Sequence, residues 1–232
     1  MRGAAQINAI RGAAQVLGEV RPQLVFLGGC VLGLYARPRG TSLRTTDDVD
    51  CVSTVVPWIR QEQLLADLCS RRVLIPDLER QYRYRVAQTG LVIDVLSPDG
   101  MNIGGGDTWL RTAADHSAEF DLGGGETIRA VTPPYFLALK LSAFIDRGTE
   151  VLSSKDMEDI VFLAVEVDDL VAQVEAAGIG HEVRRLWHRA LTKHHLDERD
   201  LPDVVDAHLG AEDRIRRDEV LGVLRALVGP TP

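Results

Sequence analysis

Two aspartates separated by one residue, Asp48 and Asp50, are the side chains best suited to chemistry in this sequence. They open an apolar run, CVSTVV, that is typical of a strand. Residues i and i+2 of a strand project to the same side, so we expect Asp48 and Asp50 to point together while Val49 enters the core. Carboxylates and water are the ligands that Mg²⁺ prefers. The pair therefore predicts a magnesium site that could hold the phosphates of a nucleotide.

A glycine pair, Gly28-Gly29, ends the preceding apolar run LVFL and is followed by a short helical pattern that begins at Cys30. Glycine lets a backbone approach a phosphate closely, and a helix start offers unpaired N–H groups. We therefore expect Gly28, Gly29 and Cys30 to bind the nucleotide. Because a thiol is a poorer donor than a hydroxyl, most of this binding is assigned to backbone N–H groups.

A third aspartate, Asp94, shares one side of the predicted strand LVIDVL with Val92 and Leu96. A lone carboxylate on an otherwise apolar face suggests a specific role. If this strand pairs beside Asp48 and Asp50, Asp94 completes a metal-binding trio. It would then hold a second metal ion or take the acceptor's proton.

Lysine is rare in this chain, which has only Lys140, Lys155 and Lys193 among its 26 basic residues. Lys140 lies within the apolar stripe of a predicted helix over 134–147, so it either extends to the rim or meets an anion such as a nucleotide phosphate. Asp156, in SSKDMEDI, fits a capping box with Ser153 at the start of the next helix. The residues alone favour that capping role for Asp156.

The pattern of apolar residues predicts an α+β protein with a small mixed, mainly antiparallel sheet flanked by helices. A domain over 1–131 contains all predicted strands, and a second domain over 132–232 contains helices only. The turn Thr89-Gly90 predicts a hairpin between residues 81–88 and 91–96. The predicted helices cover residues 4–20, 30–35, 58–70, 108–117, 134–147, 154–164, 168–177, 181–195, 201–209 and 212–228, and the other strands cover 24–27, 48–56, 118–122 and 127–131.

Composition limits the classes of function. The net charge of −8 argues against stable DNA binding, although it permits a local basic groove. We find no apolar run long enough for a membrane span and no secretory signal pattern at the start. The three cysteines are too few and too scattered for a disulfide framework or a zinc site. A cytoplasmic location without a membrane partner is the expectation.

The joint pattern of Gly28-Gly29-Cys30 and Arg44-Thr45-Thr46-Asp47-Asp48-Val49-Asp50 resembles the signature of the DNA polymerase β-like nucleotidyltransferases. The later segments PPYFLALKLSAFIDRG and SKDMEDI resemble the abortive-infection type IV toxin family (AbiEii), which includes the mycobacterial MenT-type toxins. The similarity runs from about residue 24 to 165. It implies that Asp48 and Asp50 hold metal, that Lys140 contacts the nucleotide, and that Asp156 is a second essential acid. Two departures are Cys30 in place of a small hydroxyl residue and a long loop from Gly29 to Asp48.

The expected reaction is Mg²⁺-dependent transfer of a nucleoside monophosphate from a nucleoside triphosphate to an acceptor, with one or two metal ions. The resemblance implies a tRNA or protein acceptor and a toxin that has a cognate antitoxin. A small hydroxylated acceptor such as an aminoglycoside is an alternative that suits the acidic composition. A non-catalytic nucleotide-binding module is another, and Cys30 is the feature that favours it.

Several conspicuous residues receive structural interpretations. The histidines near residues 181–195 are expected at the surface, since they lack acidic partners at ligand spacing. The triplets 104–106 and 123–125 are expected to be loop glycines because no lysine and helix follow them. Tyr82 and Tyr84 fit an ordinary strand better than a base-stacking platform. The arginines at 37, 39 and 44 could form a phosphate-facing or a solvated loop.

Overall fold

The computed structural model describes residues 3–36, 46, 48–55, 58–100, 108–147, 150–209 and 211–229. These residues form two compact units. The first contains residues 3–34 and the described residues between 46 and 132, and the second contains residues 35–36 and the described residues from 133 to 229. The predicted loop arginines Arg37, Arg39 and Arg44 and the triplet 104–106 lie outside the described residues.

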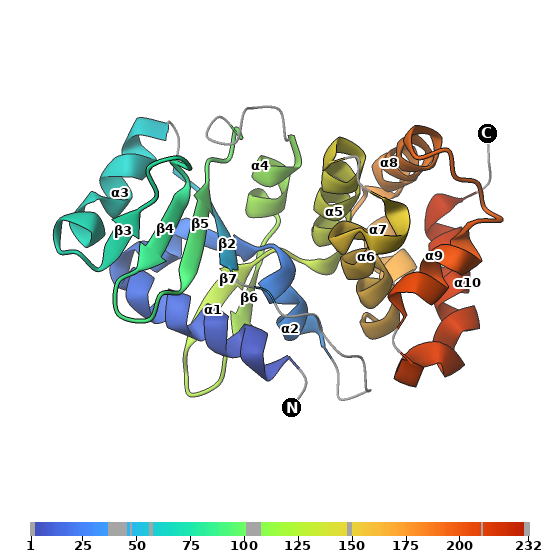
Figure 1. Ribbon diagram of the computed structural model, residues 1–232, viewed down its shortest axis with the longest axis horizontal. Coiled ribbons are helices and arrows are strands. Elements are labelled where there is room, and N and C mark those ends of the chain that lie inside the picture. Colours follow the sequence, from blue (N-terminus) through green and yellow to red (C-terminus); the bar gives the residue numbers. More distant parts are fainter. Residues whose placement is uncertain are drawn as a thin grey trace. The chain divides into compact units, whose positions relative to one another are not determined.

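The first unit is built on a mixed sheet whose described strands run in the order β3-β4-β5-β2-β1-β7-β6 (Figure 1). Two pairings are parallel, β1 with β7 and β2 with β5, and the other four are antiparallel. The predicted α+β class with a mixed, mainly antiparallel sheet is confirmed. The strands are β1 (Leu24–Leu27), β2 (Asp48–Ser53), β3 (Leu74–Pro76), β4 (Arg83–Val86), β5 (Val92–Leu96), β6 (Ala118–Asp121) and β7 (Thr127–Ala130).

The central strands form where the sequence places apolar residues. All four residues of β1 are buried, and Val49 and Cys51 of β2 are fully buried. The predicted hairpin is confirmed as β4 and β5, which pair around the turn at residues 87–91. Sequence analysis missed β3, a three-residue edge strand in which Ile75 is half exposed and Pro76 takes the last position. A strand this short, ending in proline, carries little periodic signal.

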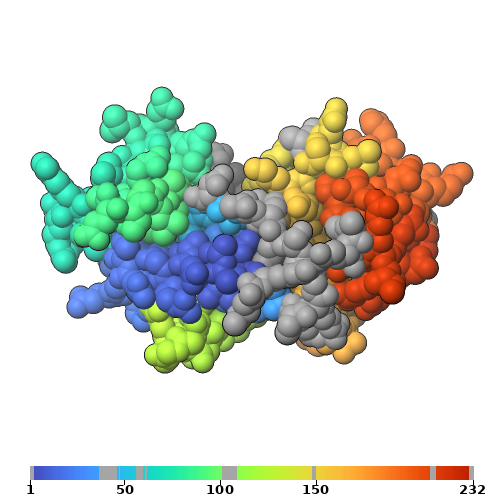
Figure 2. Space-filling view, turned by 60° about the horizontal axis from the view of Figure 1, so that its bottom comes forward, coloured from blue at the N-terminus to red at the C-terminus, as the bar shows by residue number. Residues whose placement is uncertain are grey.

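Helices of the first unit pack beside this sheet. They are α1 (Ala4–Leu17), α2 (Leu32–Tyr35), which extends by its last residue into the second unit, α3 (Trp58–Ser70) and α4 (Thr108–Asp115). The first was expected to reach residue 20, but Gly18 has φ +48° and ψ −118°, which ends the α-helix, and a 3₁₀ segment follows. Figure 2 shows α1 in blue beside the yellow-green hairpin of β6 and β7. Arg11 donates to the carbonyl of Leu122, and Arg21 pairs with Glu126 at 3.2 Å, so charged contacts hold this hairpin to the N-terminal segment.

From residue 133 onward the described chain is helical, as predicted, and its core is made by aromatic and aliphatic side chains. Phe136, Phe144 and Trp187 are among the largest fully buried side chains. Within the described residues, every helix is too short or too polar to cross a membrane. The helices are α5 (Pro133–Arg147), α6 (Lys155–Glu166), α7 (Leu170–Ala176), α8 (Gly180–Lys193), α9 (Leu201–His208) and α10 (Arg217–Val228).

Candidate active site

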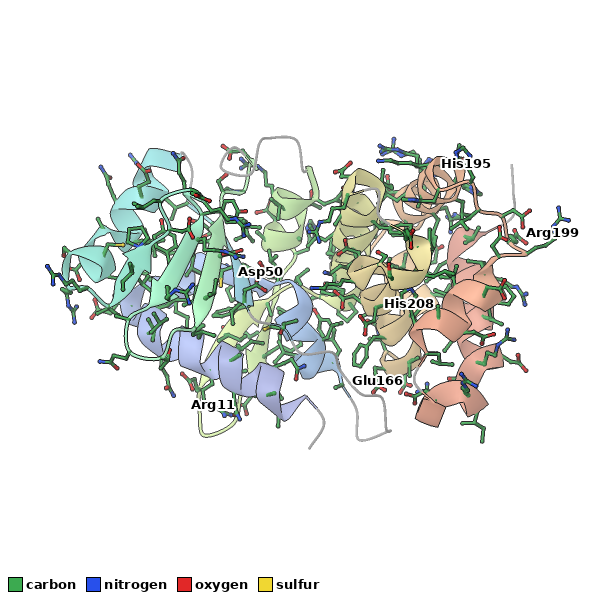
Figure 3. All side chains as sticks on the ribbon, in the orientation of Figure 1. Arg11, Asp50, Glu166, His195, Arg199 and His208 are labelled. Carbon is green, nitrogen blue, oxygen red and sulfur yellow. The ribbon has the colours of Figure 1, made fainter. Side chains whose placement is uncertain are left out.

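Three aspartates lie on one face of the sheet, on the adjacent strands β2 and β5. The parallel register pairs Asp50 directly with Asp94. It pairs Asp48 with Val92, two residues earlier along both strands and therefore on the same face. Alternation along β2 sends Val49 into the core, where it is fully buried. The expected pairing of the Asp94 strand beside Asp48 and Asp50 is confirmed. Asp50 is labelled on the sheet in Figure 3.

Asp50 is pressed against Gly28, the residue at which β1 ends. A Cβ atom built on Gly28 would lie 1.8 Å from Oδ2 of Asp50 and 2.7 Å from its Cγ. Gly28 also has φ +74° and ψ −173°, a backbone conformation that is essentially confined to glycine. Two independent constraints therefore require glycine here, and together they place the Asp50 carboxylate at the turn where β1 leads into the next helical segment.

The thiol of Cys30 is buried and contacts strand β2. Its Sγ lies 3.0 Å from the Thr46 hydroxyl and 3.0 Å from the carbonyl oxygen of Asp48, to which it donates. The side chain thus links the glycine turn to the start of β2. Its predicted role in nucleotide binding stays a prediction.

Arg83, on β4, is a cation that contacts two of these aspartates. Its Nε and Nη2 donate to the two oxygens of Asp94 at 2.8 and 2.7 Å, and the same Nη2 donates to Oδ2 of Asp48 at 2.9 Å. The hydrogen bond to Asp94 is the main reason why the pKa of the Arg83 guanidinium is raised. The Asp94 side chain is 7% exposed, whereas that of Asp48 is 37% exposed. Arg83 therefore occupies both oxygens of the deeper carboxylate and one of the shallower.

This geometry bears on the predicted metal trio. Within the described part of the chain, no three His, Cys, Asp or Glu side chains are arranged to hold a metal ion. Asp48 and Asp50 remain a suitable pair, because Mg²⁺ is usually held by one or two carboxylates together with waters and substrate phosphates. The role of Asp94 as third metal ligand or base stays a prediction, and the Arg83 pair stands against it.

The cysteine nearest the aspartates is Cys51, and burial determines the protonation state of its thiol. Burial, and then the charge of Asp50, raise the pKa of the Cys51 thiol well above its ordinary value. Cys51 is therefore a protonated core residue. All three cysteines are free, as expected, although Cys69 is only partly buried.

In the second unit, Lys140 is buried in an ion-pair network between α5 and α6. Its Nζ lies 2.6 Å from Oδ2 of Asp159 and 3.1 Å from Oδ1 of Asp156. Arg147 pairs with Asp156 at 3.2 Å. Lys140 does meet anions, as one of the two sequence interpretations held, and in the structure these anions are carboxylates. Its contact with a nucleotide and the essential role of Asp156 stay predictions.

The start of α6 corrects the predicted capping box. Ser154, rather than Ser153, is the N-cap, and its hydroxyl accepts a hydrogen bond from the Met157 N–H. Asp156 is 3% exposed and pairs with Lys140 and Arg147. Its carboxylate is therefore used for tertiary ion pairing, which the local spacing could not distinguish from a cap.

Other conspicuous residues are structural. Tyr84 lies on β4 and is buried, as the ordinary strand interpretation expected. His194 was expected at the surface but is half-buried: its ring stacks on Phe144 with centroids 4.2 Å apart, and its Nε2 lies 3.2 Å from the Phe144 carbonyl oxygen. His181 and His195 are exposed.

Sequence reasoning missed three residues of these networks, Arg83, Arg147 and Asp159. Arg83 could have been found from the hairpin, because a register in which Tyr84 faces Ile93 places Arg83 opposite Asp94. Asp159 lies three residues after Asp156, on the same face of α6. That spacing was a signal, but an acid at this position of a helix is usually solvated.

No protein-family model and no curated protein matches the sequence. A likeness exists among solved structures. The crystal structure of an antigenic nucleotidyltransferase-like protein from Paracoccidioides brasiliensis aligns with 89% of this chain and 94% of its own, with a TM-score of 0.50 and 14% sequence identity. This likeness shows that the chain has a nucleotidyltransferase-like fold.

Proposed function

We propose that this protein is a metal-dependent nucleotidyltransferase that moves a nucleoside monophosphate from a nucleoside triphosphate to an acceptor. An acceptor nucleophile attacks the α-phosphorus, the bond from that phosphorus to the bridging oxygen breaks, and pyrophosphate leaves. The acceptor's proton passes to solvent or to a carboxylate at the site. Catalysis of this kind depends mainly on positioning and on neutralising phosphate charge.

The observation that carries the proposal is the placement of Asp50 against Gly28, with Asp48 on the same face of β2. A glycine turn lets phosphate groups come close to the backbone, and the two carboxylates beside it can hold a divalent cation. Such a cation, when bound, neutralises phosphate charge and orients the α-phosphorus. The nucleotidyltransferase-like fold supports the same class of reaction.

Asp48 and Asp50 are the residues that we assign to the metal. Gly28 and Gly29 shape the turn, and Cys30 fixes the start of β2 through the Asp48 carbonyl oxygen. The Asp50 carboxylate lies beside the glycine turn, and the absence of a side chain at Gly28 leaves room for it there.

The acceptor is proposed from the resemblance alone. The resemblance to the abortive-infection type IV toxins implies that the acceptor is tRNA or protein. It also implies that the chain is a toxin whose growth inhibition a partner antitoxin relieves. Because the half-buried pair Asp48 and Asp50 does not specify an acceptor class, a small hydroxylated acceptor is included in the test below.

A second candidate, a non-catalytic nucleotide-binding module, is favoured by one observation. Arg83 neutralises Asp94 and part of Asp48, which leaves fewer carboxylate oxygens for metal than an active trio would offer. The two candidates differ in whether a phosphorus–oxygen bond is broken.

The test is incubation of the protein with each α-³²P-labelled triphosphate and Mg²⁺, together with total tRNA, cell-lysate protein or an aminoglycoside. We expect label on one acceptor class and release of pyrophosphate. Asp50→Asn should reduce labelling at least about 100-fold. Asp67→Asn, an exposed acid on α3 with 74% of its side chain accessible, is the control and should change nothing. Equal labelling by Asp50→Asn would refute the mechanism, and nucleotide binding without label would favour the module.

A further inference from the structure

Arg83 lies on the same sheet face as the three aspartates and contacts two of them. The antiparallel register pairs Arg83 with Asp94, and the parallel register on the other side of β5 pairs Asp94 with Asp50. Arg83, Asp94 and Asp50 thus form one row across β4, β5 and β2. Asp48 lies one row away and is reached diagonally by the Arg83 Nη2 at 2.9 Å.

The guanidinium stands where a second cation would be needed. Both oxygens of Asp94 accept hydrogen bonds from Arg83, at 2.8 and 2.7 Å, whereas Asp48 is paired through Oδ2. Bidentate pairing of this kind fixes the arginine in position and is stronger than a single contact. Arginine also stays charged at any working pH.

Charge balance points to the same conclusion. The three carboxylates and the guanidinium that pairs with two of them together carry two negative charges, which one divalent cation neutralises. Without Arg83 the three carboxylates would carry three negative charges, which favours the binding of two divalent ions.

We propose that Arg83 is a built-in cation that takes the place of a second metal ion, so that the chain holds a single divalent ion through Asp48 and Asp50. Asp94 is then a positioning residue that fixes Arg83, rather than a metal ligand or a base. This inference rests on the proposed metal site, but it concerns the number of ions and the role of Asp94.

The experiment counts bound Mn²⁺ ions per chain by electron paramagnetic resonance and calorimetry. We expect one ion in the wild type and in Arg83→Lys, which keeps the positive charge. Arg83→Gln should bind two ions, and the double variant Arg83→Gln/Asp94→Asn should bind one again. Arg85→Gln is the matched control, because Arg85 follows on the same face of β4 and donates to the Gly90 carbonyl oxygen rather than to these acids. It should bind one ion.

A second measurement covers the case in which Arg83→Gln does not fold. Asp94→Asn should lower Mn²⁺ affinity less than tenfold, whereas Asp50→Asn should lower it more than 100-fold. The proposal is overturned if the wild type binds two ions or none, if folded Arg83→Gln still binds one, or if Asp94→Asn weakens binding as much as Asp50→Asn. One ion with no label transfer would refute the proposed function alone, and label transfer with two ions would refute this inference alone.

Discussion

Replacing Gly28 with alanine would bring one added carbon too close to three atoms of the Asp50 side chain. The added Cβ would lie 1.8 Å from Oδ2 of Asp50, whereas non-bonded heavy atoms pack at about 3.5 Å. The main chain at Gly28 is held by β1, which is buried on all four residues. The Asp50 carboxylate must therefore move by more than about 1 Å, and it is the side chain proposed to hold the metal.

The expected losses in transfer rate and in unfolding free energy have separate causes. A displacement of about 1 Å in a catalytic group costs about 100-fold in rate. The backbone at φ +74° and ψ −173° adds about 1–3 kcal/mol of strain for alanine, of which the stiffer unfolded chain returns about 0.4–1 kcal/mol. We expect Gly28→Ala to lose about 100-fold in label transfer and about 1–2 kcal/mol in unfolding free energy.

Gly90→Ala is the matched control. Gly90 also has φ +74°, but a Cβ atom there would meet no other atom within 4 Å. This variant should lose only the stability that a positive φ costs alanine, measured by urea unfolding, and keep its transfer rate and Mn²⁺ affinity. If Gly28→Ala transferred label as well as Gly90→Ala does, the reasoning that places Asp50 at the site would fail.

Three further changes test the networks around these groups. Lys140→Met would remove the buried ammonium that pairs with Asp159 at 2.6 Å, so the unfolding free energy in urea should fall by about 3–5 kcal/mol. The exposed Lys155→Met should lose less than about 0.5 kcal/mol, and equal losses would contradict the buried network. Cys30→Ser keeps a donor for the Asp48 carbonyl oxygen, so transfer rates should stay within about threefold, and a complete loss would show that the thiol has another role. Burial raises the pKa of Tyr84 to about 12, so its proton stabilises the fold below pH 10 and this stability is lost as the pH rises from 10 to 12. Tyr84→Phe should remove about 2 kcal/mol of the alkaline loss measured between pH 8 and 11.5, and an unchanged loss would show that other groups cause it.

Much of the fold could be predicted because it depends on local pattern. The apolar runs that begin at Leu24 and at Asp48 give the central strands, and alternation places Asp48 and Asp50 together. The turn at Gly90 fixes the hairpin, and with it the position of Asp94 opposite Arg83. The pairing of Asp94 with Asp50 comes from the parallel contact of β5 with β2. In these cases the periodicity of side chains contains the spatial information.

The parts that could not be predicted depend on long side chains and tertiary partners. Arg83 reaches Asp48 across an intervening strand, and Lys140 bonds with Asp159 on another helix. Arginine and lysine span several ångströms, so neither periodicity nor spacing specifies that Arg83 also reaches Asp48 or which carboxylate Lys140 meets. The cap at Ser154 differs from the expected Ser153 for a related reason, since Asp156 is drawn into ion pairs rather than toward the helix end.

The central claim is that Asp48 and Asp50, beside Gly28, hold a divalent ion and the phosphates of a nucleotide. A crystal structure with Mn²⁺ and a non-hydrolysable nucleoside triphosphate tests it most directly, because the anomalous signal locates the ion. We predict one peak at about 2.0–2.2 Å from oxygens of Asp48 and Asp50, with phosphate oxygens completing its coordination. A nucleotide bound elsewhere, or an ion that contacts neither carboxylate, would contradict the account.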